Sequence, residues 1–119
     1  MKVAVVGSRQ LTVSDLGQYL LPETTEIVSG GAKGIDMCAA DFAESRGLIV
    51  TEFVPQYARY GRAAPLVRNY QIIAYADRAV VFWDGVSRGT KYTIDLCHQM
   101  GKPVTVYRDC DGVFIKQNR

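Results

Sequence analysis

Hydrophobic residues along the chain gather in short runs that alternate with segments of helical spacing. The runs are rich in valine, isoleucine and aromatic residues, and several are apolar throughout rather than alternating. This pattern is typical of strands buried on both faces. It predicts five strands, at residues 2–7, 26–29, 48–54, 78–83 and 104–107. The turn sequence Asp-Cys-Asp-Gly at 109–112 makes residues 113–116 a candidate partner strand in a C-terminal hairpin.

The segments between the strands carry apolar residues three or four positions apart, which predicts helices. Thr12 and Asp15 resemble a capping box ahead of a short helix over 16–20. Gly47 is suited to end the next helix, and Pro65 to begin the third. We predict the three longer helices at residues 35–46, 65–76 and 89–100. Residues 55–64 are predicted to be a loop, which is long for such a connection.

Strands of the buried type that alternate with helices favour a parallel sheet covered on both faces. With right-handed crossovers, the simplest topology is a three-layer, Rossmann-like open sheet. The expected fold is therefore α/β, mostly parallel, with about five strands and helices on both faces. No linker, repeat or low-complexity stretch divides the chain, so we expect residues 1–119 to form a single domain.

Composition narrows the classes of protein. The 119 residues are 48% hydrophobic and 22% charged, which is the balance of a globular domain. No apolar run approaches the length of a membrane span, and residues 1–7 are too short for a secretory signal. Cys38, Cys97 and Cys110 lack C-x-x-C spacing, so neither a disulfide framework nor a zinc site is indicated. We expect a cytoplasmic protein without a membrane partner, a metal or a cofactor. The net charge of +2 is too small to indicate nucleic-acid binding by itself.

The candidate chemistry lies after the strands, because ligands of open parallel sheets bind beyond the carboxyl ends of the strands. These ends are rich in glycine, serine and threonine, with cations close by, which suits an anion. The candidate ligand-binding residues at these junctions are Gly7, Ser8, Arg9, Gly30, Gly31, Lys33, Gly34, Ser87, Gly89 and Thr90. Glu52 and Asp84 also lie at the carboxyl ends of strands. The two glycine-rich junctions admit a plainer interpretation as tight turns that open capped helices.

The segment 30–34 is neither a Walker loop nor a G-x-G-x-x-G motif. Asp36 follows it and has three open interpretations: favourable interaction with the helix dipole, capping, or binding of a ribose hydroxyl. Arg68 and Asn69 open the helix after the long loop and face the same end of the sheet, although a solvated surface arginine is the alternative. Tyr57, Tyr60 and Trp83 are candidates to stack on a base or to belong to the core. His98 lies far from the strand ends.

Residues 28–36 read Val-Ser-Gly-Gly-Ala-Lys-Gly-Ile-Asp. This segment is similar to the Ser-Gly-Gly-Ala-Arg/Lys-Gly-Ile-Asp signature of DNA-processing protein A (DprA/Smf). Together with the initial Val-Gly-Ser-Arg, Arg68-Asn69 and Gly89-Thr90, it makes residues 2–108 resemble the SLOG superfamily. That superfamily unites DNA-processing protein A with the Lonely Guy (LOG) enzymes, and the resemblance is closest to its small stand-alone members related to YspA.

The resemblance implies a Rossmann-like domain that binds a nucleotide or nucleotide-derived ligand, with phosphate on the glycine turns, as a sensor or processing factor. In LOG enzymes a Gly-Thr-x-x-Glu motif and an arginine cleave the N-glycosidic bond of a nucleoside monophosphate. Gly89-Thr90 and Arg68 match this pattern, whereas Thr93 stands at the glutamate position. Threonine cannot stabilise an oxocarbenium ion as a carboxylate does.

Three expectations follow from the resemblance. The first is nucleotide binding. The second is phosphoribohydrolase activity with Arg68 and a displaced carboxylate, for which we take Glu52 ahead of Asp84 or Asp36. The third is binding of single-stranded DNA in a groove of basic residues. The family also implies pairing into homo-oligomers through helices.

Overall fold

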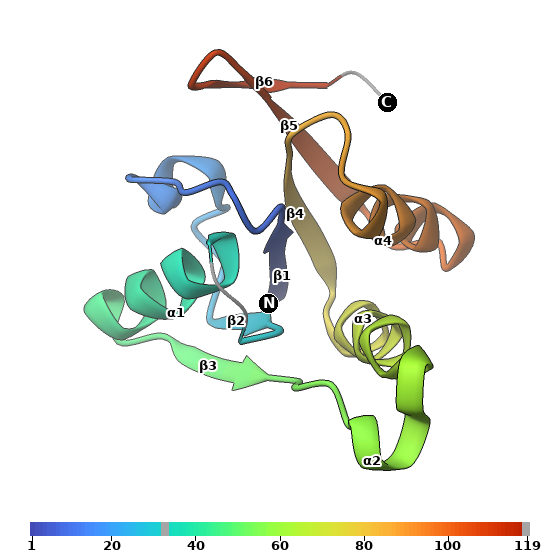
Figure 1. Cartoon of the computed structure of the whole chain (residues 1–119). Coiled ribbons are helices and arrows are strands. Elements are labelled where there is room, and N and C mark those ends of the chain that lie inside the picture. The colour runs from blue at the N-terminus through green and yellow to red at the C-terminus, as the bar shows by residue number, and fades with distance from the viewer. Residues whose placement is uncertain (32–33, 118–119) are drawn as a thin grey trace.

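The computed structural model describes residues 1–31 and 34–117, and they contain one six-stranded sheet. The strands are β1 (Lys2–Gly7), β2 (Glu26–Ser29), β3 (Ile49–Glu52), β4 (Arg78–Trp83), β5 (Val104–Cys110) and β6 (Val113–Lys116). Their order across the sheet is β3-β2-β1-β4-β5-β6 (Figure 1). The first five strands run parallel, and β6 returns antiparallel to β5 as the second strand of a hairpin. The predicted α/β fold and the C-terminal hairpin are confirmed.

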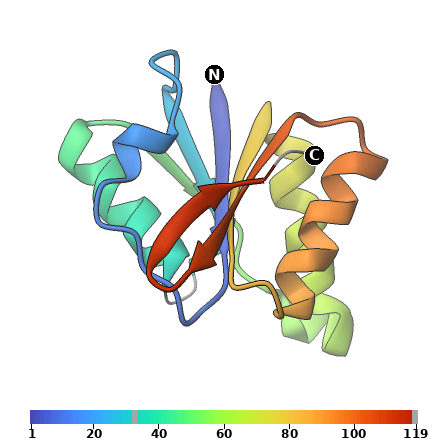
Figure 2. The ribbon, with the colours of Figure 1, turned by 90° about the horizontal axis from the view of Figure 1, so that it is seen from above.

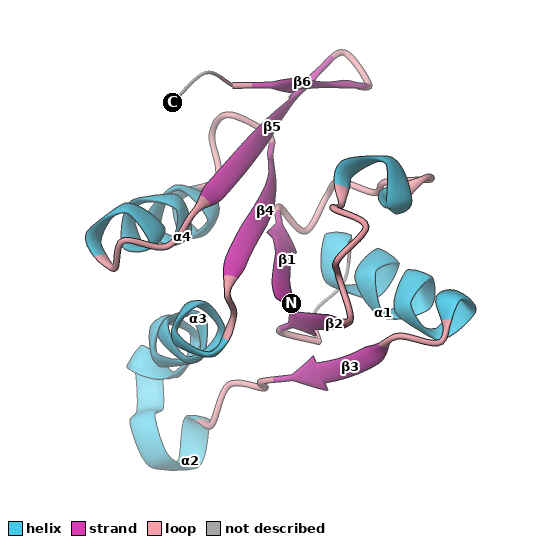
Figure 3. Cartoon of the chain, turned by 180° about the vertical axis from the view of Figure 1, so that it is seen from behind, coloured by secondary structure: helices cyan, strands magenta, loops and turns pink. Residues whose placement is uncertain are grey.

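Helices cover both faces of the sheet, as Figure 3 shows from behind. The 3₁₀ helix η1 (Leu16–Tyr19) and α1 (Ile35–Arg46) pack on one face, against a core that includes Val5, Ile27 and Phe82. On the other face, α3 (Ala64–Tyr75) and α4 (Arg88–Gln99) enclose a second core. The members of that core include Ala4, Val28, Ile72, Ile73, Val81, Ile94, Cys97 and Val106. The central strands β1, β2 and β4 are thus buried on both sides, which explains why their sequences are mainly apolar.

Two local predictions are wrong. The first helix begins at Leu16 with Asp15 as its N-cap and no capping side chain, so Thr12 does not form a capping box. The preceding segment stays irregular because the Val13 N–H bonds to the Cys38 sulfur at 3.5 Å and the Val13 side chain is buried. The predicted loop 55–64 contains a short helix, α2 (Tyr57–Tyr60), and a 3₁₀ turn, η2 (Gly61–Ala63). Neither buries a residue, so neither leaves an apolar pattern in the sequence.

The strand order determines where a fold of this kind binds ligands. From β1 the chain moves outward to β2 and β3, and it then crosses back to β4 on the other side of β1. The carboxyl ends of β1 and β4 therefore lie side by side while their connections diverge, which opens a crevice between them. Figure 2 shows this divergence from above, with α1 and α3 on opposite sides of the central strands. No helix in the described ranges has both the length and the apolar character that a bilayer crossing requires.

Candidate functional site

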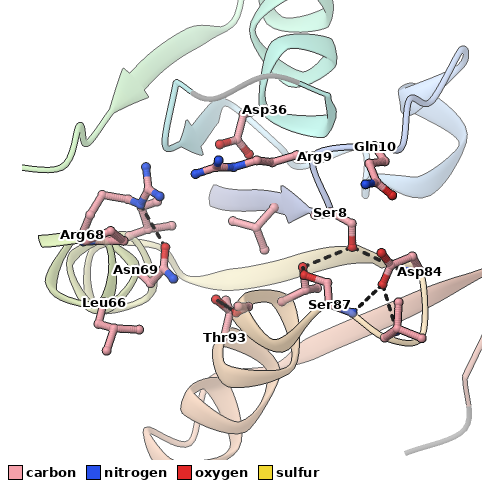
Figure 4. A pocket seen from close by; sticks show the side chains of 17 residues that line it. Ser8, Arg9, Gln10, Asp36, Leu66, Arg68, Asn69, Asp84, Ser87 and Thr93 are labelled. Carbon is pink, nitrogen blue, oxygen red and sulfur yellow. Dashed lines mark hydrogen bonds between the residues drawn. The ribbon is translucent and has the colours of Figure 1, made fainter. Parts of the chain in front are cut away.

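A cleft of about 570 Å³ opens at the carboxyl ends of β1 and β4 (Figure 4). Its walls come from the loop after β1, the first turn of α1, the start of α3 and the segment that joins β4 to α4. The predicted site residues that line it are Gly7, Ser8, Arg9, Asp36, Asn69, Ser87, Gly89 and Thr90 of the ligand-binding set and Arg68 of the catalytic set. The volume lies in the range of small-molecule sites, about 300–1,000 Å³. Residues as distant in the chain as Ser8 and Thr90, 82 positions apart, thus share one cavity.

Hydroxyl groups form one side of the cleft. The buried Ser8 Oγ lies 3.3 Å from Thr90 Oγ1 and accepts the Asp84 N–H at 3.3 Å. Thr90 Oγ1 in turn donates to Ser87 Oγ at 3.2 Å. This series of hydrogen bonds joins the end of β1 to the first turn of α4. It holds three hydroxyls, each able to donate and accept, at the point where the dipole of α4 favours an anion.

Asp84 shapes the turn that precedes α4. Its Oδ1 accepts the Val86 N–H at 2.9 Å and the Ser87 N–H at 2.7 Å. Burial alone would raise the pKa of Asp84, but these backbone donors, with Ser8, outweigh it, so that the pKa lies below the ordinary 3.8. The carboxylate is therefore ionised near neutral pH and committed to the turn. Ser87 occupies the N-cap position of α4 but makes no side-chain cap hydrogen bond, so the Gly89 and Thr90 N–H groups are left uncapped at the end of the helix that meets the cleft.

Arg68 forms the opposite wall. Although charged, it is only 9% exposed. Its Nε donates to Asn69 Oδ1 at 2.9 Å and its Nη1 to the Gly30 carbonyl at 3.0 Å. Burial is the main cause that lowers the pKa of Arg68, and the Arg9 charge adds to it, while Asp36 and Tyr57 act the other way. An arginine has five N–H donors, so this fixed guanidinium retains donors for a ligand.

Asp36 and Arg9 complete the Arg68 side of the site. Figure 4 shows Arg9, Arg68 and Asp36 across the cleft from Asp84 and Ser87. Asp36 lies in the first turn of α1 and is 8% exposed. Its carboxylate favours the charged form of Arg68, whereas the exposed Arg9 disfavours it. Among the described residues, two cations against one buried carboxylate leave this side of the cleft suited to a negatively charged group.

Glycines keep the site open because a larger residue would displace its walls. A methyl group on Gly30 would lie 2.9 Å from Arg68 Cζ and 3.1 Å from Asp36 Oδ2. A methyl group on Gly7 would lie 2.6 Å from both Ile35 Cγ1 and the Phe82 carbonyl oxygen. Gly30 supports the cleft from behind Arg68 and does not line it.

The remaining predicted residues lie beside the cleft or outside the described part of the chain. Gly31 and Gly34 have positive φ angles of 71° and 76° and shape the turn before α1. Glu52 is exposed at the end of β3, with its carboxyl group near Gly31, and does not line the cleft. Lys33 lies outside the described residues. The structure therefore brings the β1, α3 and α4 residues together and leaves Glu52 two strands away from β1.

Sequence reasoning missed Gln10 and the apolar side of the cleft, Pro65, Leu66, Ile72 and Val86. Gln10 continues the loop after Ser8 and Arg9, so its position in that loop was the available signal. Thr93 also lines the cleft, and its hydroxyl donates to the Gly89 carbonyl at 3.1 Å within α4. Of the aromatic candidates, Tyr57 is 59% exposed and acts electrostatically on Arg68, while the Trp83 indole donates to the Ser87 carbonyl.

The described residues contain no group of three or more histidine, cysteine or carboxylate side chains placed to hold a metal ion. Comparison with family models, with curated proteins and with solved structures finds no significant match to this chain. Its function must therefore be argued from the cleft itself.

Proposed function

We propose that the protein binds a nucleotide or nucleotide-derived ligand in the cleft between the ends of β1 and β4, as a sensor or processing factor. The observation that carries the proposal is the buried Arg68. A guanidinium held by Asn69 and the Gly30 carbonyl, beside a second arginine, is a pre-organised partner for a phosphate or another oxyanion.

The opposite side of the cleft supports the same ligand chemistry. The uncapped N-terminus of α4 and the hydroxyls of Ser8, Ser87 and Thr90 suit a phosphate group. Asp36 lies where it can accept a hydrogen bond from a ribose hydroxyl, and Leu66 and Val86 supply apolar surface for a base. A ligand with both an anionic and an apolar part fits this division.

The proposal includes a cellular compartment and an oligomeric state. Three free cysteines, Cys38, Cys97 and Cys110, suit the reducing cytoplasm, where nucleotides are also found. Homo-oligomerisation is part of the proposal.

Calorimetric titration tests the proposal. The panel comprises AMP, other mononucleotides, ADP-ribose, NAD, cyclic nucleotides, inorganic phosphate and short single-stranded DNA, and each sample is then examined by chromatography for released base. We expect saturable binding of a nucleotide, tighter than that of phosphate, without base release. Base release would instead establish a hydrolase in which another carboxylate replaces the missing glutamate. Binding of DNA alone, with an affinity that falls steeply with salt, would overturn the proposal.

A further inference from the structure

The two edges of the sheet are β3 and β6. Within the described residues, β3 pairs with β2 alone and β6 with β5 alone. An edge strand presents backbone N–H and C=O groups to which another strand can add. Figures 1 and 3 place β6 at the rim of the molecule, away from α1 and α3.

The pairing of β6 with β5 determines which backbone groups face outward. The Gln117 N–H donates to the Val106 carbonyl at 2.8 Å, so Gln117 directs its backbone groups at β5. Because the directions of the backbone groups alternate along a strand, Val113 and Ile115 also direct their N–H and C=O groups at β5. Phe114 and Lys116 direct theirs at the open edge. The strand is held firmly in this orientation, since the Phe114 ring packs against Phe82 with 5.0 Å between centroids.

The side chains of β6 also alternate, between the two faces of the hairpin. Val113 and Ile115 point to one face of the hairpin and are 60% and 53% exposed. The region before the strand is acidic, with Asp111 in the turn and Asp109 near the end of β5, and the end of the strand carries Lys116. Two copies of β6 in antiparallel orientation would place the acidic turn of each beside the lysine of the other. In β3, by contrast, Glu52 is the one charged residue, so that strand offers no such complementarity to its own copy.

We propose that β6 pairs antiparallel with β6 of a second copy of this chain and joins two sheets into one. A continuous sheet requires a two-fold axis perpendicular to it, and facing residues must then lie on the same face. The register that opposes apolar residues on that face centres on Phe114. It places Val113 opposite the partner's Ile115 and Gly112 opposite the partner's Lys116.

The backbone fits this register. Each Phe114 exchanges two hydrogen bonds with the partner's Phe114, because its groups face the open edge. Each Lys116 then lies beside the partner's turn, where Gly112 has a φ of 87° and its N–H donates to Asp109 Oδ1 at 3.1 Å. None of these residues lines the cleft, and the dimer leaves both clefts open.

Sedimentation velocity from about 1 μM to about 1 mM tests the pairing, since a single added strand pair gives a weak dimer. We expect the mass to rise with concentration toward twice 13.2 kDa. Ile115→Lys should raise the dissociation constant at least tenfold, roughly, because it sets a charge opposite the partner's Val113. Ile49→Lys is the matched control, as Ile49 is 61% exposed on the other edge strand, and it should leave the dissociation constant unchanged.

Cross-linking tests the register. In a Cys110→Ser background, chains with Val113→Cys are mixed with chains with Ile115→Cys under mild oxidation. The mixture should form disulfide-linked dimers faster than either variant alone, because residues 113 and 115 face each other across the axis. Lys116→Glu should weaken the dimer about tenfold, and Asp111→Asn should relieve part of that loss by removing a neighbouring like charge on the partner.

Three results would overturn the proposal. The first is a monomer at every concentration. The second is loss of the dimer with Ile49→Lys and not with Ile115→Lys. The third is loss with Tyr70→Lys alone, which would indicate pairing through the exposed face of α3. Circular dichroism of each variant separates misfolding from loss of association.

Discussion

Buried polar groups at the two ends of the sheet differ in what they contact: other side chains at the amino end, and a cleft at the carboxyl end. At the amino end, Glu26 accepts hydrogen bonds from Thr51 Oγ1 and the Tyr75 hydroxyl, each at 2.6 Å. At the carboxyl end, Ser8 and Arg68 are equally buried but face a cavity of about 570 Å³. Both ends hold charged groups in low exposure, but at the carboxyl end these groups line an open cleft. One end therefore stabilises the fold, and the other is available to a ligand.

The largest expected difference between the ends concerns the two glycines that flank α1. Gly34 and Gly47 both have positive φ, 76° and 68°. A methyl group on Gly34 would lie 2.5 Å from the Arg9 carbonyl oxygen, whereas one on Gly47 would meet nothing within 4 Å. Gly34→Ala should destabilise the fold by about 3 kcal/mol or more, and Gly47→Ala by about 1 kcal/mol. Urea unfolding measures both, and equal losses would show that the turn before α1 does not pack against the β1 loop.

How far the sequence could predict this arrangement depends on the range of the interaction. The buried runs and the turn residues are local signals, so the strands, the longer helices and the hairpin were predictable. The contact of Arg68 with the Gly30 carbonyl spans 38 residues and depends on strand order, which periodicity does not carry. For the same reason Glu52 and Asp84 looked equivalent as residues at strand ends, although of the two Asp84 alone lines the cleft.

Replacing Arg68 should lower the affinity for a nucleotide, whereas replacing the nearby Arg62 should not. If the guanidinium pairs with a phosphate, Arg68→Ala should weaken nucleotide binding by about 1.5–3 kcal/mol, or roughly 10–150-fold. Arg62→Ala is the control, because Arg62 is exposed in η2 and does not line the cleft. Calorimetry measures both affinities, with thermal unfolding to verify the fold. Equal affinity of Arg68→Ala and the parent protein would remove Arg68 from the site.

At the amino end, replacing a carboxylate should affect stability and not binding. Hydrogen bonds, first from Thr51 and then from Tyr75, hold the pKa of Glu26 below its ordinary 4.5. The ionised Glu26 therefore stabilises the fold fully above pH 4.5, and this contribution declines as the pH falls from 4.5 toward the lowered pKa. Glu26→Gln should lower the free energy of unfolding by about 1 kcal/mol at pH 7. The difference from the parent should shrink below pH 4.5, and a constant difference across that range would contradict this account.

The last comparison concerns two buried serines at the carboxyl ends of neighbouring strands. Ser8 Oγ accepts the Asp84 N–H, whereas Ser29 Oγ is the one buried side-chain polar atom in the described residues without a hydrogen-bond partner. Ser8→Ala leaves a backbone donor unsatisfied and should cost about 1–2 kcal/mol, while Ser29→Ala removes an unsatisfied hydroxyl and should change stability by about 0 to 1 kcal/mol in the favourable direction. Urea unfolding of both variants without ligand measures the difference.

Repeating the comparison with a saturating nucleotide sharpens it. A ligand that contacts Ser8 should stabilise the Ser8→Ala variant less than the parent, because stabilisation by a ligand follows its affinity for the folded state. Ser29 is 0% exposed, so Ser29→Ala should gain the same stabilisation as the parent. A loss of ligand stabilisation in the Ser29 variant instead would mean that the binding position extends beneath the turn before α1, and that the hydroxyl lacks a partner because the ligand supplies one.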